Sequence, residues 1–121
     1  MNFNKDGKPS ITIDLRKFRI RIHKKTVHYL GNPEYVLLLV NPEECALVII
    51  KSNQFDPRAH RLTDESGEKY NAMELYSRAL LENICDVSNN LNKDKIYRIF
   101  GEMIPYESIA RFHMSDADLI N

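Results

Sequence analysis

The 121-residue chain has no tryptophan, two cysteines and four glycines. Cys45 and Cys85 are too few and too far apart to predict a disulfide framework or a metal clip, so we expect two reduced thiols packed as small apolar groups. The glycines are scattered, and no glycine-rich phosphate-binding loop is predicted. No apolar run approaches the roughly 18–20 residues of a membrane-spanning helix, and the first ten residues contain no apolar signal core. These absences predict a cytoplasmic protein without a membrane partner.

The sequence also lacks a pattern typical of an active site. His23 and His28 are five residues apart, which differs from the i, i+4 spacing that places two imidazoles on one helix face. His60 and His113 are isolated, and the acidic segment 64–68 lacks the ligand spacing of a calcium loop. We therefore predict a protein that is not an enzyme and that has no metal and no cofactor.

Charge is distributed unevenly along the chain, although the formal net charge is zero. Residues 1–30 carry eight Lys or Arg against two acids, or +6, whereas residues 31–121 carry nine against fifteen, or −6. This asymmetry predicts an anionic partner for the first segment, most simply nucleic acid. The neutral total favours another interpretation, in which the cations only keep a strand edge soluble, because domains committed to nucleic acid are usually basic overall.

The cations are concentrated in residues 16–25, RKFRIRIHKK, where six of ten side chains are Lys or Arg. Apolar and polar residues alternate from 18 to 23, which predicts a strand with an apolar face and a cationic face. The cationic side would carry Arg19, Arg21 and His23. The candidate nucleic-acid-binding residues are the six cations of this segment: Arg16, Lys17, Arg19, Arg21, Lys24 and Lys25.

Around this segment we predict strand, then helix. Residues 10–23 are expected to form one long strand with a bulge or two strands with a tight bend, because the alternation slips at Arg16–Lys17. Val27 and Leu30 lie three apart just before Gly31, which predicts a short helix with glycine in the left-handed conformation at its end.

A β-hairpin is predicted next. Two apolar runs, 35–40 and 46–50, flank the sequence Asn-Pro-Glu-Glu-Cys, which is typical of a turn with Pro42 at its first corner. Neither run alternates, so both faces of the hairpin should be covered, with Leu38 and Ile49 fully buried. Either the second half of the chain or a second subunit would cover the second face.

The second half repeats this order of elements. We expect a strand at 70–75, a helix over 77–87 capped by Ser77, and two strands, 95–100 and 108–113, on either side of a turn around Pro105. The predicted fold is α+β, mainly β, with two β-α-β-β units forming a small barrel or sandwich. The predicted organisation is listed by range: a flexible arm at 1–9, a first unit at 10–52, a linker at 53–69, a second, diverged unit at 70–114 and an acidic tail at 115–121.

Residues 18–52 contain a strand with a basic residue at Arg19, a short helix ending in Leu30-Gly31, and a hairpin over 35–51 with an acidic turn. In this order they resemble the swapped-hairpin β-barrel half-unit of AbrB-, MazE- and MraZ-type proteins. Only Arg19 is carried over from the family by position, and the other cations are nominated on charge and strand phase.

The resemblance implies a DNA-binding transcriptional regulator, or an antitoxin-like repressor, that acts as a homodimer. Lys and Arg contacts to phosphates would supply salt-sensitive affinity for double-stranded DNA, and sequence preference would need Arg side chains to reach base edges. The alternative is a non-enzymatic protein-interaction or structural module, whose basic strand meets an acidic protein partner. Pairing of the cations with acids such as Glu43, Glu44, Glu102 or Glu107 would favour that alternative.

Overall fold

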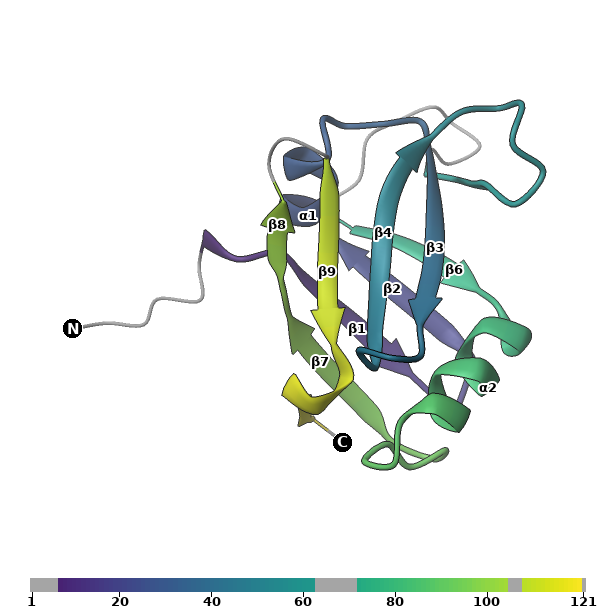
Figure 1. Cartoon of the computed structure of the whole chain (residues 1–121), viewed down its shortest axis with the longest axis vertical. Helices are drawn as coiled ribbons and strands as arrows, with labels where there is room; N and C mark the ends of the chain where they lie inside the picture. Colours follow the sequence, from purple (N-terminus) through teal and green to yellow (C-terminus); the bar gives the residue numbers. More distant parts are fainter. Residues whose placement is uncertain (1–6, 63–71, 105–107, 121) are drawn as a thin grey trace.

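Figure 1 shows the computed structural model, which describes residues 7–62, 72–104 and 108–120. Two five-stranded antiparallel sheets form two layers. Sheet A has the strand order β10-β7-β1-β2-β6, and sheet B has the order β5-β3-β4-β9-β8. The elements are β1 (Ser10–Asp14), β2 (Arg19–His23), α1 (Lys24–Tyr29), β3 (Tyr35–Asn41), β4 (Ala46–Ser52), β5 (His60–Arg61), β6 (Ala72–Tyr76), α2 (Arg78–Val87), β7 (Ile96–Phe100), β8 (Glu102–Ile104), β9 (Ile109–His113), the 3-10 turn η2 (Met114–Asp116) and β10 (Ala117–Leu119).

The prediction of an α+β fold that is mainly β is confirmed. The inner faces of both sheets share one core, which includes the fully buried Ile11 and Ile20 of sheet A and Ile49 and Phe112 of sheet B. The helices α1 and α2 lie at opposite ends of the layers (Figure 1). Among the described residues each sheet ends in two edge strands, so neither sheet closes into a barrel.

Residues 10–23 form a hairpin, which is the second of the two predicted arrangements. The carboxylate of Asp14 accepts hydrogen bonds from the backbone N–H groups of Arg16 and Lys17 at 3.0 and 3.3 Å. An aspartate at the start of a turn stabilises it in this way. Phe18 has a φ of 52° and lies in the turn, so β2 begins one residue later than the alternation indicates.

The predicted short helix is confirmed as α1. Gly31 follows it with a φ of 89° and donates its N–H to the carbonyl of His28 at 2.9 Å. Thr26 is fully buried, and its Oγ1 donates to the carbonyl of Ser10 and accepts from the N–H of Ser10, both at 2.9 Å. The helix is therefore tied to the start of β1.

The predicted β-hairpin is confirmed as β3 and β4. The side-chain oxygen of Asn41 accepts from the N–H groups of Glu43 and Glu44 at 3.1 and 3.3 Å, with Pro42 at the first corner. Cys45 closes the turn with a φ of 50°.

Only one face of this hairpin is fully covered within the described residues. Leu38 and Ile49 are buried against sheet A, as predicted, with 9% and 0% exposure. On the opposite face Leu37 and Val48 are half-buried and Leu39 is 37% exposed. The expectation that both faces are covered is therefore not met inside one chain, because the second half adds β9 and β8 beside β4 rather than a layer on top of it.

The first part of the second half follows the prediction. The strand β6 precedes α2, and the hydroxyl of Ser77 accepts from the N–H of Leu80 at 3.3 Å as the predicted cap. Leu81 and Ile84 of α2 are fully buried. Tyr70, which we expected at the start of the strand, lies outside the described residues.

The two strands predicted after α2, at 95–100 and 108–113, are confirmed as β7 and β9, but they lie in different sheets. β7 pairs with β1 in sheet A, whereas β9 pairs with β8 and β4 in sheet B. The chain changes sheets at Gly101, where an added Cβ would lie 2.6 Å from Cδ1 of Phe112 and would clash with the carbonyl oxygen of Arg111. The residue that makes this crossing possible is a lone glycine, which gave no clear signal in the sequence.

Two ranges predicted to be irregular contain short strands. β5 lies within the range predicted as a linker and pairs with β3. β10 lies within the range predicted as a tail and pairs with β7. Residues 1–6, 63–71, 105–107 and 121 lie outside the described residues.

Candidate nucleic-acid interface

A row of polar side chains crosses the outer face of sheet A. Glu74 of β6 lies opposite Arg21 of β2, Arg21 lies opposite Thr12 of β1, Thr12 lies opposite Arg98 of β7, and Arg98 lies opposite Asp118 of β10. Residues directly opposite each other in antiparallel strands point to the same side. Two arginines therefore flank Thr12 at the centre of the sheet, and a carboxylate ends the row on each side.

The predicted phase of β2 is confirmed. Ile20 and Ile22 are fully buried in the core. The side chains of Arg19 and Arg21, which alternate with them, are 27% and 52% exposed. The cationic side of β2 thus faces outward.

Asp14 pairs with two of the cations near the turn, Arg16 and Arg19. Its Oδ2 lies 3.2 Å from Nη2 of Arg19, and its Oδ1 lies 3.5 Å from Nε of Arg16. Burial of this carboxylate would raise its pKa, but the side-chain hydrogen bond from Arg16 and the backbone N–H groups of Arg16 and Lys17 outweigh burial and lower the pKa below its usual value. Arg16 and Arg19 therefore contribute to the structure of the hairpin.

Glu74 provides a second, weaker pairing. Its carboxylate oxygens lie 3.7 Å from Nη1 of Arg19 and 4.0 Å from Nε of Arg21. The side chain of Glu74 is 39% exposed, so water screens both contacts. Arg21 is consequently the more loosely held of the two arginines.

His23 lies beside the two arginines that flank Thr12. Its Nε2 is 2.9 Å from the hydroxyl of Thr12. Burial lowers the pKa of His23, and the nearby charges of Arg98 and Arg21 lower it further. Burial and the two neighbouring arginines together favour the neutral form of the imidazole.

The remaining candidates lie at the two ends of β2. Lys17 is exposed in the turn, and Lys24 and Lys25 are exposed at the start of α1. At about 3.3 Å per residue of strand, the distance from Lys17 to Lys24 is roughly 20 Å. The predicted cations therefore extend along the whole length of the strand.

Sequence reasoning did not nominate Arg98. It lies in the alternating segment of β7, with Tyr97 and Ile99 buried on either side of it, and this alternation is visible in the sequence. What the sequence could not provide is the pairing of β7 with β1, which brings Arg98 next to His23.

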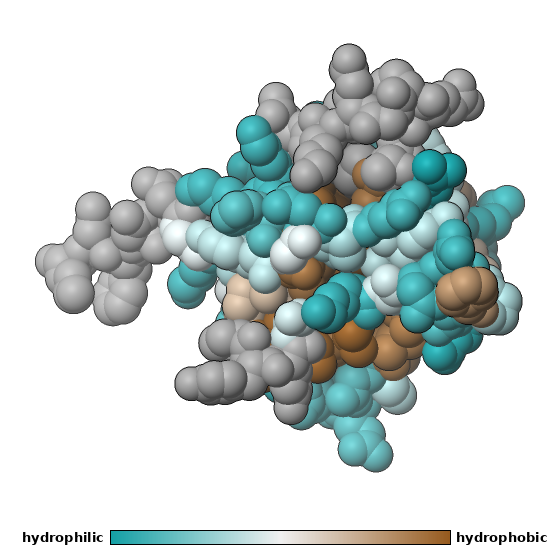
Figure 2. All heavy atoms as spheres, turned by 90° about the horizontal axis from the view of Figure 1, so that it is seen from above, coloured by the Kyte–Doolittle hydropathy of each residue, from teal (hydrophilic) through white to brown (hydrophobic). Residues whose placement is uncertain are grey.

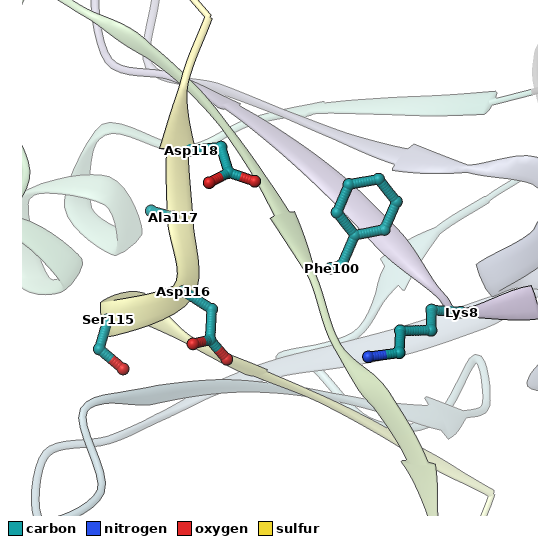
Figure 3. A pocket seen from close by; sticks show the side chains of 6 residues that line it. All are labelled: Lys8, Phe100, Ser115, Asp116, Ala117 and Asp118. Carbon is teal, nitrogen blue, oxygen red and sulfur yellow. The ribbon is translucent and has the colours of Figure 1, made fainter. Parts of the chain in front are cut away.

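An acidic hollow of about 420 Å³ borders this face at β7 and β10. Figure 3 shows the carboxylates of Asp116 and Asp118 on one side of the hollow, and Phe100 and Lys8 on the other. Among the described strands of sheet A, positive charge therefore lies on β2 and β7, and the outermost strands β6 and β10 carry acids.

Two of the four acids that would have favoured the alternative interpretation pair with a cation outside the nominated set. Glu44 of the β3–β4 turn and Glu102 of β8 pair with Arg111 of β9 at 3.8 and 2.7 Å. Glu107 lies outside the described residues. Three of the six nominated cations, Arg16, Arg19 and Arg21, are instead paired with Asp14 and Glu74.

Comparisons of this chain with protein-family models, with curated proteins and with solved structures find no match. Over residues 7–62, 72–104 and 108–120, the His, Cys, Asp and Glu side chains form no group of three or more that could hold a metal ion. No helix in this described part of the chain is long and apolar enough to cross a membrane.

Proposed function

We propose that this protein is a DNA-binding transcriptional regulator or antitoxin-like repressor that contacts duplex phosphates through the outer face of sheet A. The observation that carries the proposal is the convergence of Arg21 and Arg98 on either side of Thr12, from strands far apart in the sequence. Two exposed guanidinium groups on one sheet face, whose charges both act on His23, form an arrangement suited to an anionic polymer.

The charge balance of the face supports this proposal in spite of the ion pairs. The cations on β2, its turn, α1 and β7 number seven, and the ion pairs and strand registers described above place three carboxylates in contact with them or opposite them. The seven are Arg16, Lys17, Arg19, Arg21, Lys24, Lys25 and Arg98, and the three are Asp14, Glu74 and Asp118. The concentration of cations is a property of this face, because the chain as a whole is neutral.

Within the face we assign two different roles. Arg16 and Arg19 hold the buried carboxylate of Asp14 and position the hairpin. Arg21, Arg98 and the lysines at the ends of β2 would contact phosphates. A stretch of roughly 20 Å along duplex DNA presents about twelve phosphate charges, so several of these contacts can form at once without reading the bases.

The relationship to the AbrB-, MazE- and MraZ-type swapped-hairpin proteins belongs to the same proposal. Its support is that each half contains a strand, a helix and further strands in that order, β2-α1-β3-β4 in the first half and β6-α2-β7-β8-β9 in the second. Corresponding strands of the two halves also pair with each other, β2 with β6 and β4 with β9, both antiparallel. Such pairing is what two copies of one unit related by a two-fold axis would produce.

The experiment is a titration of the purified protein against fluorescently labelled random duplex DNA at about 50 and about 200 mM salt. We expect saturable binding that weakens steeply between these concentrations, because phosphate contacts release counterions. Absence of saturable binding at the lower salt concentration would contradict the proposal.

A protein-interaction module is the second candidate function. The observation that favours it lies on the other side of the molecule, where the outer face of sheet B carries apolar side chains that the described residues only partly cover. The two functions use different faces and do not exclude each other.

A further inference from the structure

The outer face of sheet B carries a continuous apolar row across four strands. Leu37 of β3 lies opposite Ile50 of β4, Ile50 lies opposite Ile109 of β9, and Ile109 lies opposite Ile104 of β8. All four side chains are only half-buried. A sheet face that water covers usually carries polar residues, and contiguous apolar patches on such a face mark interaction sites.

A second row extends the apolar surface. Leu39 lies opposite Val48, and together with Pro42 of the turn they line a hollow of about 400 Å³. Leu39 is 37% exposed at the edge of this hollow. Figure 1 looks onto this face of sheet B, and in Figure 2, seen from above, hydrophobic residues reach the surface in the lower part of the view.

The charged residues beside these rows carry both signs. Arg111 continues the row of Leu39 and Val48, and it pairs with Glu102 at 2.7 Å and with Glu44 at 3.8 Å. Hydrogen bonds from Arg111 lower the pKa of Glu102 below its usual value. Because both carboxylates contact the guanidinium, charges of opposite sign lie side by side within the face, and its field selects neither a strongly acidic nor a strongly basic partner.

We propose that a second copy of this chain covers the outer face of sheet B, so that two protomers pack sheet to sheet about a two-fold axis. In such an isologous contact one patch meets itself, which requires a surface that is apolar at the centre and compensated in charge at the rim. The row Leu37–Ile50–Ile109–Ile104 supplies the apolar centre, and the cluster of Arg111, Glu102 and Glu44 supplies a rim in which both carboxylates contact the guanidinium.

The dimensions of the face suit a dimer. The five strands of sheet B contain 24 residues, which at about 3.3 Å per residue and a strand spacing of about 4.8 Å give a projected area of about 380 Å². The accessible surface is larger because side chains corrugate it, so it is of the order of the roughly 800 Å² that each partner buries in a standard interface. Aligned packing of two sheets also needs no exchange of strands between the protomers.

The test is sedimentation equilibrium of the full chain, compared with a Val48→Asp variant. Val48 points outward and its neighbour Ile49 points into the core, so the substitution adds a carboxylate to the contact from both protomers without entering the core. We expect a dimer at micromolar concentration for the unaltered chain. For Val48→Asp we expect a monomer with an unchanged circular dichroism spectrum, corresponding to a dimer dissociation constant raised about a hundredfold or more.

Two further variants serve as controls. Leu119→Asp places the same charge on an exposed apolar residue of β10, on sheet A, and is expected to remain a dimer. Ile49→Asp places it in the core and is expected to unfold the chain, which would show that circular dichroism detects a buried charge.

Two results would overturn the proposal. The first is an unaltered chain that is monomeric at high micromolar concentration, and the second is a Val48→Asp variant that remains a folded dimer. In the second case, dissociation by Leu119→Asp would place the contact on sheet A. None of these outcomes depends on nucleic acid, because the face lies opposite the outer face of sheet A.

Discussion

Arg19 and Asp14 meet across the β1–β2 hairpin, with 3.2 Å between Nη2 of the guanidinium and Oδ2 of the carboxylate. The carboxylate is buried and also accepts the two backbone N–H groups of the turn, whereas the guanidinium is partly exposed. This pair connects the cationic face to the stability of the fold. A variant without Arg19 would lose stability and binding together, so Arg21 and Arg98 give the sharper test of function.

Replacing Asp14 by Asn should destabilise the protein at neutral pH by about 1–3 kcal/mol, because a buried charged hydrogen-bonding group loses its partners. Its pKa is lower in the folded state than in the unfolded state. The contribution of this carboxylate to stability is therefore complete above the unfolded pKa of about 3.9 and is lost as the pH falls through the lower folded pKa.

Urea unfolding of both proteins between about pH 7 and about pH 2 measures this effect. The stability of Asp14→Asn should decline less steeply toward acid than that of the unaltered chain. Asp94→Asn, which removes a carboxylate at an exposed position before β7, is the matched control. Parallel acid declines of the Asp14→Asn variant and the unaltered chain would contradict the assignment.

Replacing both Arg21 and Arg98 by Ala should weaken binding to random duplex DNA about tenfold or more and reduce the slope of log affinity against log salt by about two. Folding should be retained, because both side chains are exposed and neither partners a buried group in the described contacts. Fluorescence anisotropy at several salt concentrations measures both effects.

The matched control for this double variant is Arg58→Ala with Lys93→Ala, which removes the same charge from exposed positions outside the nominated set. It should keep most of the affinity. Equal losses in the two double variants would mean that net charge, rather than the face of sheet A, determines binding.

Binding of duplex DNA should strengthen as the pH falls from about 8 to about 5.5, a range that contains the ordinary histidine pKa of about 6.5. Burial and the charges of Arg98 and Arg21 lower the pKa of His23 in the free protein. Phosphates near these arginines would compensate their charge and raise the pKa of His23 again, so the bound state takes up a proton.

The stability of the free protein should decrease as the pH falls, whereas its affinity for DNA should increase. Since the folded pKa of His23 is depressed, its contribution is complete above the unfolded pKa and is lost as the pH falls through the folded value. His23→Gln should remove most of the pH dependence of binding in this range. If the DNA affinity of His23→Gln changed with pH as that of the unaltered chain does, a group other than His23 would cause the pH dependence of binding.

Replacing Gly101 by Ala should destabilise the protein by about 1–3 kcal/mol or more, because overpacking forces neighbours to move. The added Cβ would meet the ring of Phe112, which is fully buried, and the carbonyl of Arg111. Thermal unfolding measures the effect, and Gly7→Ala, with no atom within 4 Å of the added Cβ, is the control. Equal melting temperatures of the Gly101→Ala variant and the unaltered chain would mean that β7 and β8 do not cross between the sheets in this way.

The elements that the sequence determined are those with a local cause. Alternation placed Ile20 and Ile22 inward, and Gly31 ended α1 as predicted. Pro42 with its neighbouring Asn41 placed the turn of the β3–β4 hairpin. Each of these features depends on side-chain periodicity or on a backbone preference within a few residues, so the sequence alone is sufficient.

The candidate site was only partly accessible to the same reasoning. The six cations on β2, its turn and α1 could be nominated from the sequence. Their acidic partners could not. The pairing of β6 with β2 brings Glu74 to Arg21, and the pairing of β7 with β1 brings Arg98 to His23. Such pairings join strands far apart in the chain, and no local periodicity encodes them.

The tertiary structure also decided which apolar surface is buried. The runs at 35–40 and 46–50 are apolar on both faces, and the sequence gives no reason to prefer Ile49 over Val48 as a core residue. The position of sheet A on one side of sheet B buries Ile49 and leaves Val48 half-buried. Burial is a property of two packed layers, so it is fixed only when the long-range strand order places one sheet against the other.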